Sequence, residues 1–204
     1  MTIGLPRAAL AYHHTTTPAA KLSALPWQLR QIVLGRSGDS PEVDFADIDL
    51  FALVVNAQLG ISPEMIEIWS QIQERQIPRF LLVQNLDEGD IDFDDIVLIG
   101  TRVLEPLATP FLVIHGASGE PIGLIELATM KVHNYESGSA VSEEPDSELA
   151  GIVSDFRDEY MQDYASLGDD AFENGIYTIA LPISTEAGFG FRELETLLLR
   201  IPRR

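Results

Sequence analysis

The sequence predicts an α/β fold, a mainly parallel β-sheet covered by helices on both faces. Short apolar runs alternate with stretches of helical periodicity along the chain. Several of these runs are apolar at nearly every position, as expected of strands buried on both faces. Strands that alternate with helices imply right-handed crossover connections and therefore a parallel sheet. The chain has 204 residues, 46% of them hydrophobic and none of them cysteine, so its composition predicts one compact domain without disulfides.

Six runs have the composition of strands. They comprise residues 8–12, 31–34, 50–56, 80–84, 111–115 and 177–183. The last two are expected to be the final strands of the main sheet.

The helix after the third strand has a clear start signal. Ser62 is a capping residue, and Pro63 suits the first helical position because a proline there loses no hydrogen bond. Met65, Trp69 and Ile72 then recur at helical spacing and predict the buried face.

Two more helices follow from apolar stripes. One is expected to begin within the acidic residues 90–95, since carboxylates are favourable at a helix N-terminus. Its predicted face comprises Ile96, Ile99, Val103 and Leu107. The other is the last helix of the chain, with a stripe made of Leu194, Leu197, Leu198 and Ile201.

Residues 122–174 interrupt this alternation and are expected to form an insertion between the last two strands of the main sheet. Residues 133–146 are rich in Ser, Glu and Gly and predict a loop. A helix is expected after that loop. Its apolar positions are Leu149, Val153, Phe156, Tyr160 and Tyr164.

The net charge of −19 argues against direct binding of nucleic acid, because phosphate backbones require a basic surface. This charge favours solubility, and it is also compatible with an acidic face that meets a basic partner. The first ten residues lack the features of a signal peptide, and the most apolar run, residues 50–55, is too short to span a bilayer. The sequence therefore predicts a cytoplasmic protein that does not bind membranes.

From Asp49 onward the chain resembles translation elongation factor G. DLFALVVNAQLGISPEMIEIW is similar to the family's strand, turn and Trp-bearing helix, and IPRFLLVQNLDEGDIDF falls where the family has a strand ending in its NKxD motif. GASGEPIGLIELATMKV and FRDEYMQDYASLGDD resemble parts of the family's G′ insertion. IYTIALPISTEAGFGFRELETLL resembles the last strand, the Ser-Ala loop and the final helix. The resemblance implies a P-loop NTPase-like GTPase domain over residues 1–204, with a G′-like insertion at about 122–174.

The parts that bind phosphate and Mg²⁺ are not recognisable. No GxxxxGK[ST] loop occurs, and the first strand leads directly into a threonine run that includes Thr15 and Thr16. Thr17 before Pro18 is expected to cap a short helix. In the segment after the second strand, Glu42 is the single residue that could be compared with the histidine that positions water in the family.

The base-recognition side of the family's site is better preserved. Gln84, Asn85 and Asp87 stand at the positions of the NKxD motif, and Ser184 stands in the Ser-Ala loop. Asp87 matches the carboxylate that accepts the guanine N–H groups, but it is also suited to start a helix or cap a loop.

Three functional hypotheses remain open. The first is a pseudo-GTPase without a cofactor, which acts through a protein partner such as the ribosomal stalk or another part of the translation machinery. The second is a guanine-nucleotide-binding protein, or weak GTPase, that holds GTP or GDP with Mg²⁺ around Thr15 and Thr16. The third is a decayed domain without a surviving biochemical role.

Other metal chemistry is not expected. His13 and His14 are adjacent on a strand and should point to opposite faces, and no pattern of metal-binding cysteines or histidines accompanies them. The acidic run 87–95 lacks the glycine and the distal glutamate of a calcium loop, so a solvated helix start is expected there.

Overall fold

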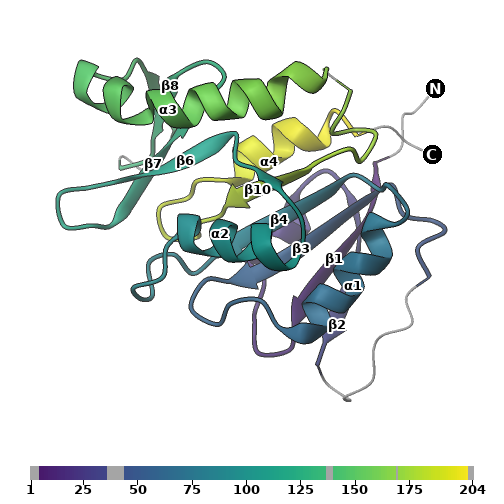
Figure 1. The fold of residues 1–204 in the computed structure, drawn as a ribbon. Coiled ribbons are helices and arrows are strands. Elements are labelled where there is room, and N and C mark those ends of the chain that lie inside the picture. Colours follow the sequence, from purple (N-terminus) through teal and green to yellow (C-terminus); the bar gives the residue numbers. More distant parts are fainter. Residues whose placement is uncertain (1–4, 36–43, 137–139, 169, 202–204) are drawn as a thin grey trace.

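A computed structural model describes residues 5–35, 44–136, 140–168 and 170–201, and its main feature is a six-stranded parallel sheet (Figure 1). The strand order is β2-β1-β3-β4-β10-β5. The strands are β1 (Arg7–His13), β2 (Gln28–Leu34), β3 (Leu50–Asn56), β4 (Arg79–Gln84), β5 (Leu107–Ala108) and β10 (Thr178–Pro182). The predicted α/β class is confirmed. Residues 36–43, which include Glu42, lie outside the described residues.

The sheet extends to both sides of β1. β2 lies on one side of β1, whereas β3, β4 and β10 follow in turn on the other side. All five neighbouring pairs are parallel, and β3 is buried at every position except its last. The short 3₁₀ helix η1 (Ala20–Ala24) links β1 to β2, and α1 (Pro63–Gln73) links β3 to β4. Right-handed crossovers in opposite directions place these two connections on opposite faces of the sheet.

α1 begins where the sequence predicts. The hydroxyl of Ser62 accepts a hydrogen bond from the backbone N–H of Met65 at 3.4 Å, and Pro63 occupies the first helical position. Met65, Trp69 and Ile72 are all buried against the sheet. The cap and the apolar spacing therefore specify both the start and the buried face of this helix.

α2 (Phe93–Val103) also begins in the predicted acidic stretch, and Asp92 is its N-cap. Its predicted buried face was wrong in part. Ile96 is buried, but Ile99 and Val103 are about two-fifths exposed, and Leu107 belongs to β5. The helix instead packs through Phe93, Ile96 and Gly100.

A second, antiparallel sheet has the order β6-β7-β8-β9. Its strands are β6 (Phe111–His115), β7 (Pro121–Glu126), β8 (Lys131–Asn134) and β9 (Val141–Glu143). The assignment of residues 111–115 to the main sheet was therefore wrong, because β6 opens the second sheet and β5 is the neighbour of β10. The loop predicted at 133–146 was also wrong in part, since it contains the end of β8 and all of β9.

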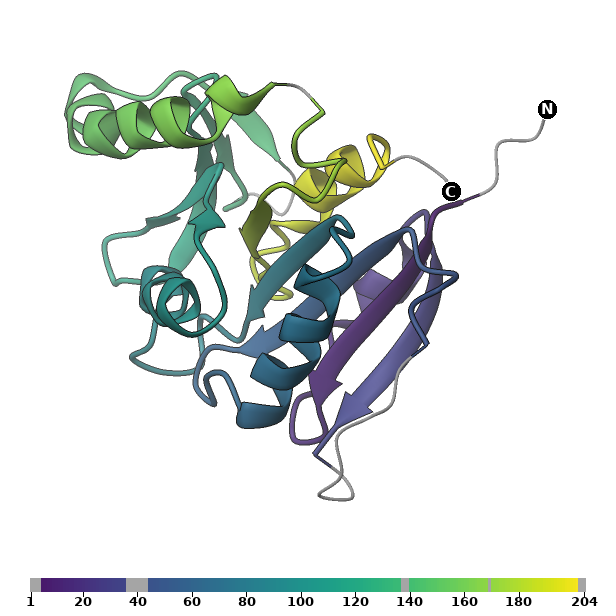
Figure 2. The ribbon, with the colours of Figure 1, turned by 45° about the vertical axis from the view of Figure 1, so that its right-hand side comes forward.

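α3 (Ser147–Asp163) follows the second sheet, and α4 (Phe191–Leu198) follows β10. A short 3₁₀ helix, η2 (Ala165–Leu167), separates α3 from β10. In Figure 2, α3 lies next to the second sheet at the upper left of the view, and α2 lies below it on the same side of the molecule. Val153 is the buried residue of α3, whereas Phe156 is half exposed. The whole predicted stripe of the last helix is buried: Leu194, Leu197, Leu198 and Ile201.

A buried carboxylate attaches the second sheet to α4. Oε1 of Glu193 accepts a hydrogen bond from the hydroxyl of Tyr135 at 2.8 Å and lies 3.0 Å from Nδ1 of His133. Its Oε2 accepts the backbone N–H of Gly190 at 3.0 Å, at the start of α4. Burial and the adjacent charge of Glu193 raise the pKa of Tyr135 well above its ordinary value.

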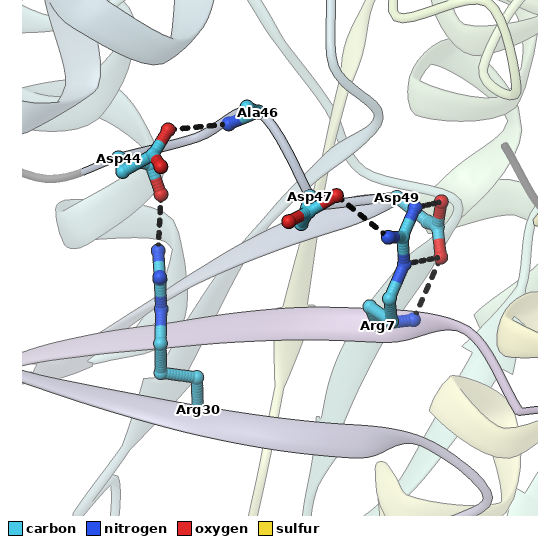
Figure 3. Close-up of polar contacts among 6 residues, drawn as sticks. All are labelled: Arg7, Arg30, Asp44, Ala46, Asp47 and Asp49. Carbon is cyan, nitrogen blue, oxygen red and sulfur yellow. Dashed lines mark hydrogen bonds and ion pairs between the residues drawn. The ribbon is translucent and has the colours of Figure 1, made fainter.

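Ion pairs join the starts of the strands. Nη2 of Arg7 on β1 donates to Asp49, just before β3, at 3.0 Å, and its Nη1 donates to Asp47 at 3.0 Å (Figure 3). Nearby, Nη2 of Arg30 on β2 donates to the carbonyl of Asp44 at 2.6 Å.

A second, more buried ion pair lies further along the same edge. Nε and Nη2 of Arg79 donate to the two oxygens of Glu105 at 2.5 and 2.6 Å. Thr178 and Trp69 donate to the same carboxylate at 2.5 and 3.1 Å. Burial would raise the pKa of Glu105, but the hydrogen bonds from Arg79 and Thr178 outweigh it and lower that pKa.

Candidate functional site

The candidate site lies at the carboxyl ends of β1, β3, β4 and β10. In open parallel sheets, ligands bind at this edge, beside the point where the strand order reverses. Here the reversal falls between β1 and β3, so the segment after β1 and the segments after β4 and β10 are the ones to consider.

Gln84, the last residue of β4, fixes the segment that follows β1. Its Nε2 donates to the carbonyl of Thr17 at 2.7 Å, and its Oε1 accepts the backbone N–H of Ala19 at 3.1 Å. The side chain is buried, and Nε2 also donates to Oδ1 of Asn85 at 3.0 Å. Both polar ends of this amide are therefore used within the protein.

Thr17 has a different role from the one predicted. η1 starts after Ala19 and has no side-chain cap, so the expectation that Thr17 caps a helix was wrong. Its backbone carbonyl is instead the acceptor for Gln84.

Thr15 and Thr16 form a tight turn with the histidines. The backbone N–H of Thr16 donates to the carbonyl of His13 at 2.8 Å, and the hydroxyl of Thr15 lies 2.7 Å from Nδ1 of His13. The rings of His13 and His14 are 4.3 Å apart, so the expectation that they point to opposite faces was wrong. β1 ends at His13, and the alternation of a strand therefore no longer applies to His14.

A cavity of about 320 Å³ opens between the segments after β4 and β10. It is lined by Thr17, Ala19, Gln84, Asn85, Asp87, Glu88, Thr185 and Glu186. Asn85 has φ of 62°, in the left-handed region, and its Nδ2 donates to Oε1 of Glu88 at 2.5 Å. The cavity thus has three carboxylates on its wall, and none of its described lining residues carries a positive charge.

Two of these carboxyl groups interact directly. A hydrogen bond to Asp87, together with the negative charge of Asp87, raises the pKa of Glu186 above its ordinary value. Asp87 does not start a helix, since Asp92 caps α2. The pair makes the cavity a place where N–H donors or cations are favoured over anions.

Ser184 lies beside the cavity but is not part of its wall. It is buried, and its hydroxyl accepts the backbone N–H of Ala187 at 3.0 Å, which closes the turn after β10. The structure thus brings Gln84, Asn85 and Asp87 together at one cavity, whereas Thr15 and Thr16 are not among its lining residues.

Glu88, Thr185 and Glu186 also line the cavity, although the sequence did not single them out as site residues. Glu186 follows Ser184 by two positions, so the loop in which Ser184 was singled out already contained it. Its proximity to Asp87 arises from the pairing of β10 with β4, which is a tertiary relationship.

The described residues contain no group of three or more His, Asp or Glu side chains arranged to hold a metal ion. Among the same residues, no helix is both long and apolar enough to cross a membrane.

Sequence similarity to known proteins is distant and covers only part of the chain. No family model matches the sequence. Elongation factor G of Ruegeria sp. (strain TM1040) is 27% identical over 145 residues, which cover 69% of this chain and 20% of that protein. Elongation factor G of Mycoplasma pneumoniae is 27% identical over 117 residues, covering 57% of this chain and 16% of that protein. For Mycoplasma genitalium elongation factor G, the identity is 24% over 137 residues, with coverage of 66% and 20%.

The fold has a solved counterpart. A crystal structure of a protein from Thermus thermophilus aligns with a TM-score of 0.68 at 19% identity, and the alignment covers 98% of this chain and 40% of that chain. The chain spans about a fifth of the length of the curated relatives that it matches. This protein therefore contains an elongation factor G-like domain, in which a mainly parallel sheet is joined to a smaller antiparallel one.

Proposed function

We propose that this elongation factor G-like domain is a pseudo-GTPase, which neither holds nor hydrolyses GTP and acts through a protein partner. The observation that carries the proposal is the link after β1. Gln84 binds both Thr17 and Ala19 there, and Thr16 turns back onto the carbonyl of His13. A phosphate-binding loop needs free backbone N–H groups, a lysine and a Mg²⁺-binding hydroxyl at this place.

The charge of the cavity supports the same conclusion. Asp87 is followed by Glu88 and faced by Glu186, so an entering nucleotide meets three carboxylates. The lysine that packs along the base in GTPases has Asn85 in its place. Hydrogen bonds to charged groups contribute about 1.5–3 kcal/mol each, so three missing phosphate contacts cost about 4.5–9 kcal/mol. That loss weakens binding by at least about three powers of ten.

The proposed partner belongs to the translation machinery. The named relatives are elongation factors, and this chain retains the second sheet together with the long helix α3. Asp155 and Asp158 are exposed on α3 and present negative charge to a partner. A basic surface on the ribosome or its stalk is the complementary binding partner.

Co-sedimentation with purified ribosomes tests this proposal. Wild-type protein should pellet with ribosomes, whereas a variant carrying Asp155→Lys and Asp158→Lys should remain in the supernatant. A control variant with two charge reversals, Glu67→Lys in α1 and Glu74→Lys at its C-cap, should pellet like wild type, since both residues are exposed and α1 lies apart from α3 in Figure 1. No co-sedimentation of the wild type, or an equal loss in both variants, would contradict the proposed partner.

A second candidate function is guanine-nucleotide binding at the 320 Å³ cavity, because Asn85 and Asp87 face it from the family's base-recognition positions. Titration of GDP against the Asp87→Asn variant discriminates the two. Micromolar binding by wild type and its loss in the variant would favour this candidate, and absence of binding in both would favour the pseudo-GTPase.

A further inference from the structure

A second cavity lies away from the candidate nucleotide edge. It has a volume of about 500 Å³ and lies between α2 and α3. α2 provides Asp94, Val97, Leu98 and Thr101, and α3 with the residue that follows it provides Phe156, Glu159, Tyr160 and Tyr164. Leu107, Thr109 and Leu112, from the start of the second sheet and the strand before it, complete the wall. The two helices lie on the same side of the molecule in Figure 2.

The rims of this cavity are apolar and uncovered. Leu98 on α2 is 53% exposed, and Phe156 on α3 is 50% exposed. Ile152, one helical turn before Phe156, is 63% exposed and extends the apolar ridge beyond the cavity. Large apolar side chains grouped in this way mark a surface that another molecule covers.

The charges at the cavity indicate that a bound molecule should be positively charged. Asp94 and Glu159 lie on opposite walls, and none of the described lining residues is basic. Asp94 is exposed at the start of α2, and Glu159 is exposed on α3, so both carboxylates are accessible to a bound molecule. The site's electrostatics raise the pKa of Asp94, through desolvation first and then the charge of Asp92. A cationic group placed between Asp94 and Glu159 would be attracted by both charges. Tyr160 and Tyr164 add aromatic faces that attract cations.

We propose that the groove between α2 and α3 binds a basic amphipathic helix of a partner protein, with its apolar side on Leu98 and Phe156 and its cations at Asp94 and Glu159. An amphipathic helix binds a partner through apolar anchors at i, i+3, i+4 and i+7, and the exposed side chains of Leu98 and Phe156 offer apolar contacts to such anchors from both walls. The inference rests on the proposed function as an interaction module. It specifies the kind of segment that the partner presents and the site at which that segment binds.

The probe is a fluorescein-labelled helix of leucine and lysine, about 18 residues or five turns long, with leucines along one face. Its fluorescence anisotropy should rise with protein concentration. Two control peptides accompany it: one has the same composition in scrambled order, and the other has glutamate in place of lysine. Neither control should bind with comparable affinity, because the first lacks the apolar face and the second repels the acidic groove.

Variants of the protein locate the peptide. Leu98→Ala and Phe156→Ala should each weaken binding by about tenfold, as truncation of a central anchor does. Leu199→Ala, at the end of α4, is the matched control, since Leu199 is 74% exposed and is not among the residues that line the groove, and it should leave the affinity unchanged. Binding that is insensitive to Leu98→Ala and Phe156→Ala, equal binding of the scrambled peptide, or no binding of the amphipathic peptide would each overturn the inference.

The outcome is separable from that of the ribosome experiment. Ribosome binding that depends on Asp155 and Asp158 but not on Leu98 would support the proposed function and rule out the groove as the binding site. Peptide binding that depends on Leu98 and Phe156, in a protein that does not pellet with ribosomes, would support the groove as a binding site and rule out the ribosome as its partner.

Discussion

The buried side chain of Gln84 bridges to Thr17, with Nε2 2.7 Å from the backbone carbonyl of Thr17. The same side chain accepts the N–H of Ala19 at 3.1 Å. These bonds join the end of β4 to the segment that leaves β1, across the edge at which parallel sheets bind ligands. Backbone groups that would otherwise be available to a ligand are thereby committed to the fold.

Replacing Gln84 with alanine should destabilise the protein by about 1–3 kcal/mol, because two partly buried hydrogen bonds are lost, one to the carbonyl of Thr17 and one from the N–H of Ala19. The measurement is the free energy of unfolding from urea titration. Gln162→Ala on the exposed part of α3 is the control and should change stability by less than about 0.5 kcal/mol. An equal, small effect of both substitutions would show that the bridge does not hold the segment.

Glu105→Gln should be more damaging, since it leaves the guanidinium of Arg79 buried without a countercharge. Removing one partner of a buried ion pair costs about 3–5 kcal/mol. Arg79 is 2% exposed, so water does not replace the lost charge. Thermal unfolding of the variant should show a clearly lowered midpoint, and Arg7→Lys, at a half-exposed pair, should show a smaller change.

The carboxylate of Glu105 should also make the free energy of unfolding depend on pH. The folded-state pKa of Glu105 is lowered, so its contribution to stability is present above the unfolded pKa of about 4.3 and is lost as pH falls through the folded value. The free energy of unfolding of wild type should therefore fall between about pH 5 and pH 3 more steeply than that of Glu105→Gln. Parallel curves for the two proteins would contradict the assigned role.

Tyr135 should make the free energy of unfolding fall as pH rises in the alkaline range. Burial and then the charge of Glu193 raise its pKa in the folded state, so it contributes stability that is present below about pH 10 and lost as pH rises further. Absorbance at the tyrosinate band should show Tyr135 ionising only when the protein unfolds. Glu193→Gln removes the charge, so Tyr135 should ionise at lower pH in that variant, and Tyr135→Phe identifies its signal.

Asp87→Ala should lower the pKa of Glu186 towards its ordinary value, since both the hydrogen bond and the repulsion from Asp87 disappear. NMR titration of the glutamate side-chain carboxyl carbons measures it directly, and Glu186→Gln assigns the resonance. An unchanged pKa of Glu186 would show that the two carboxyl groups are apart in solution.

The parts of the fold that local chemistry specifies were predicted from the sequence. Ser62 and Pro63 mark the start of α1 because a cap and a proline act within one turn. The run 50–56 was recognised as a strand because β3 is buried on both faces.

Other features depend on contacts between distant segments. Ile99 and Val103 have helical spacing, but the position of β5 decides which side of α2 is buried. β9 is exposed at all three of its positions, so it has no apolar alternation to reveal it. Glu186 reaches Asp87 only through the pairing of β4 with β10.

The most direct test of the pseudo-GTPase proposal is a titration of a fluorescent, non-hydrolysable GTP analogue against the purified protein, with and without Mg²⁺. We expect no saturable binding up to hundreds of micromolar, because the segment after β1 is hydrogen-bonded to Gln84 and the cavity is acidic. Micromolar binding that is specific for guanine and strengthened by Mg²⁺ would contradict it, and would show that a phosphate site has been rebuilt at this edge of the sheet.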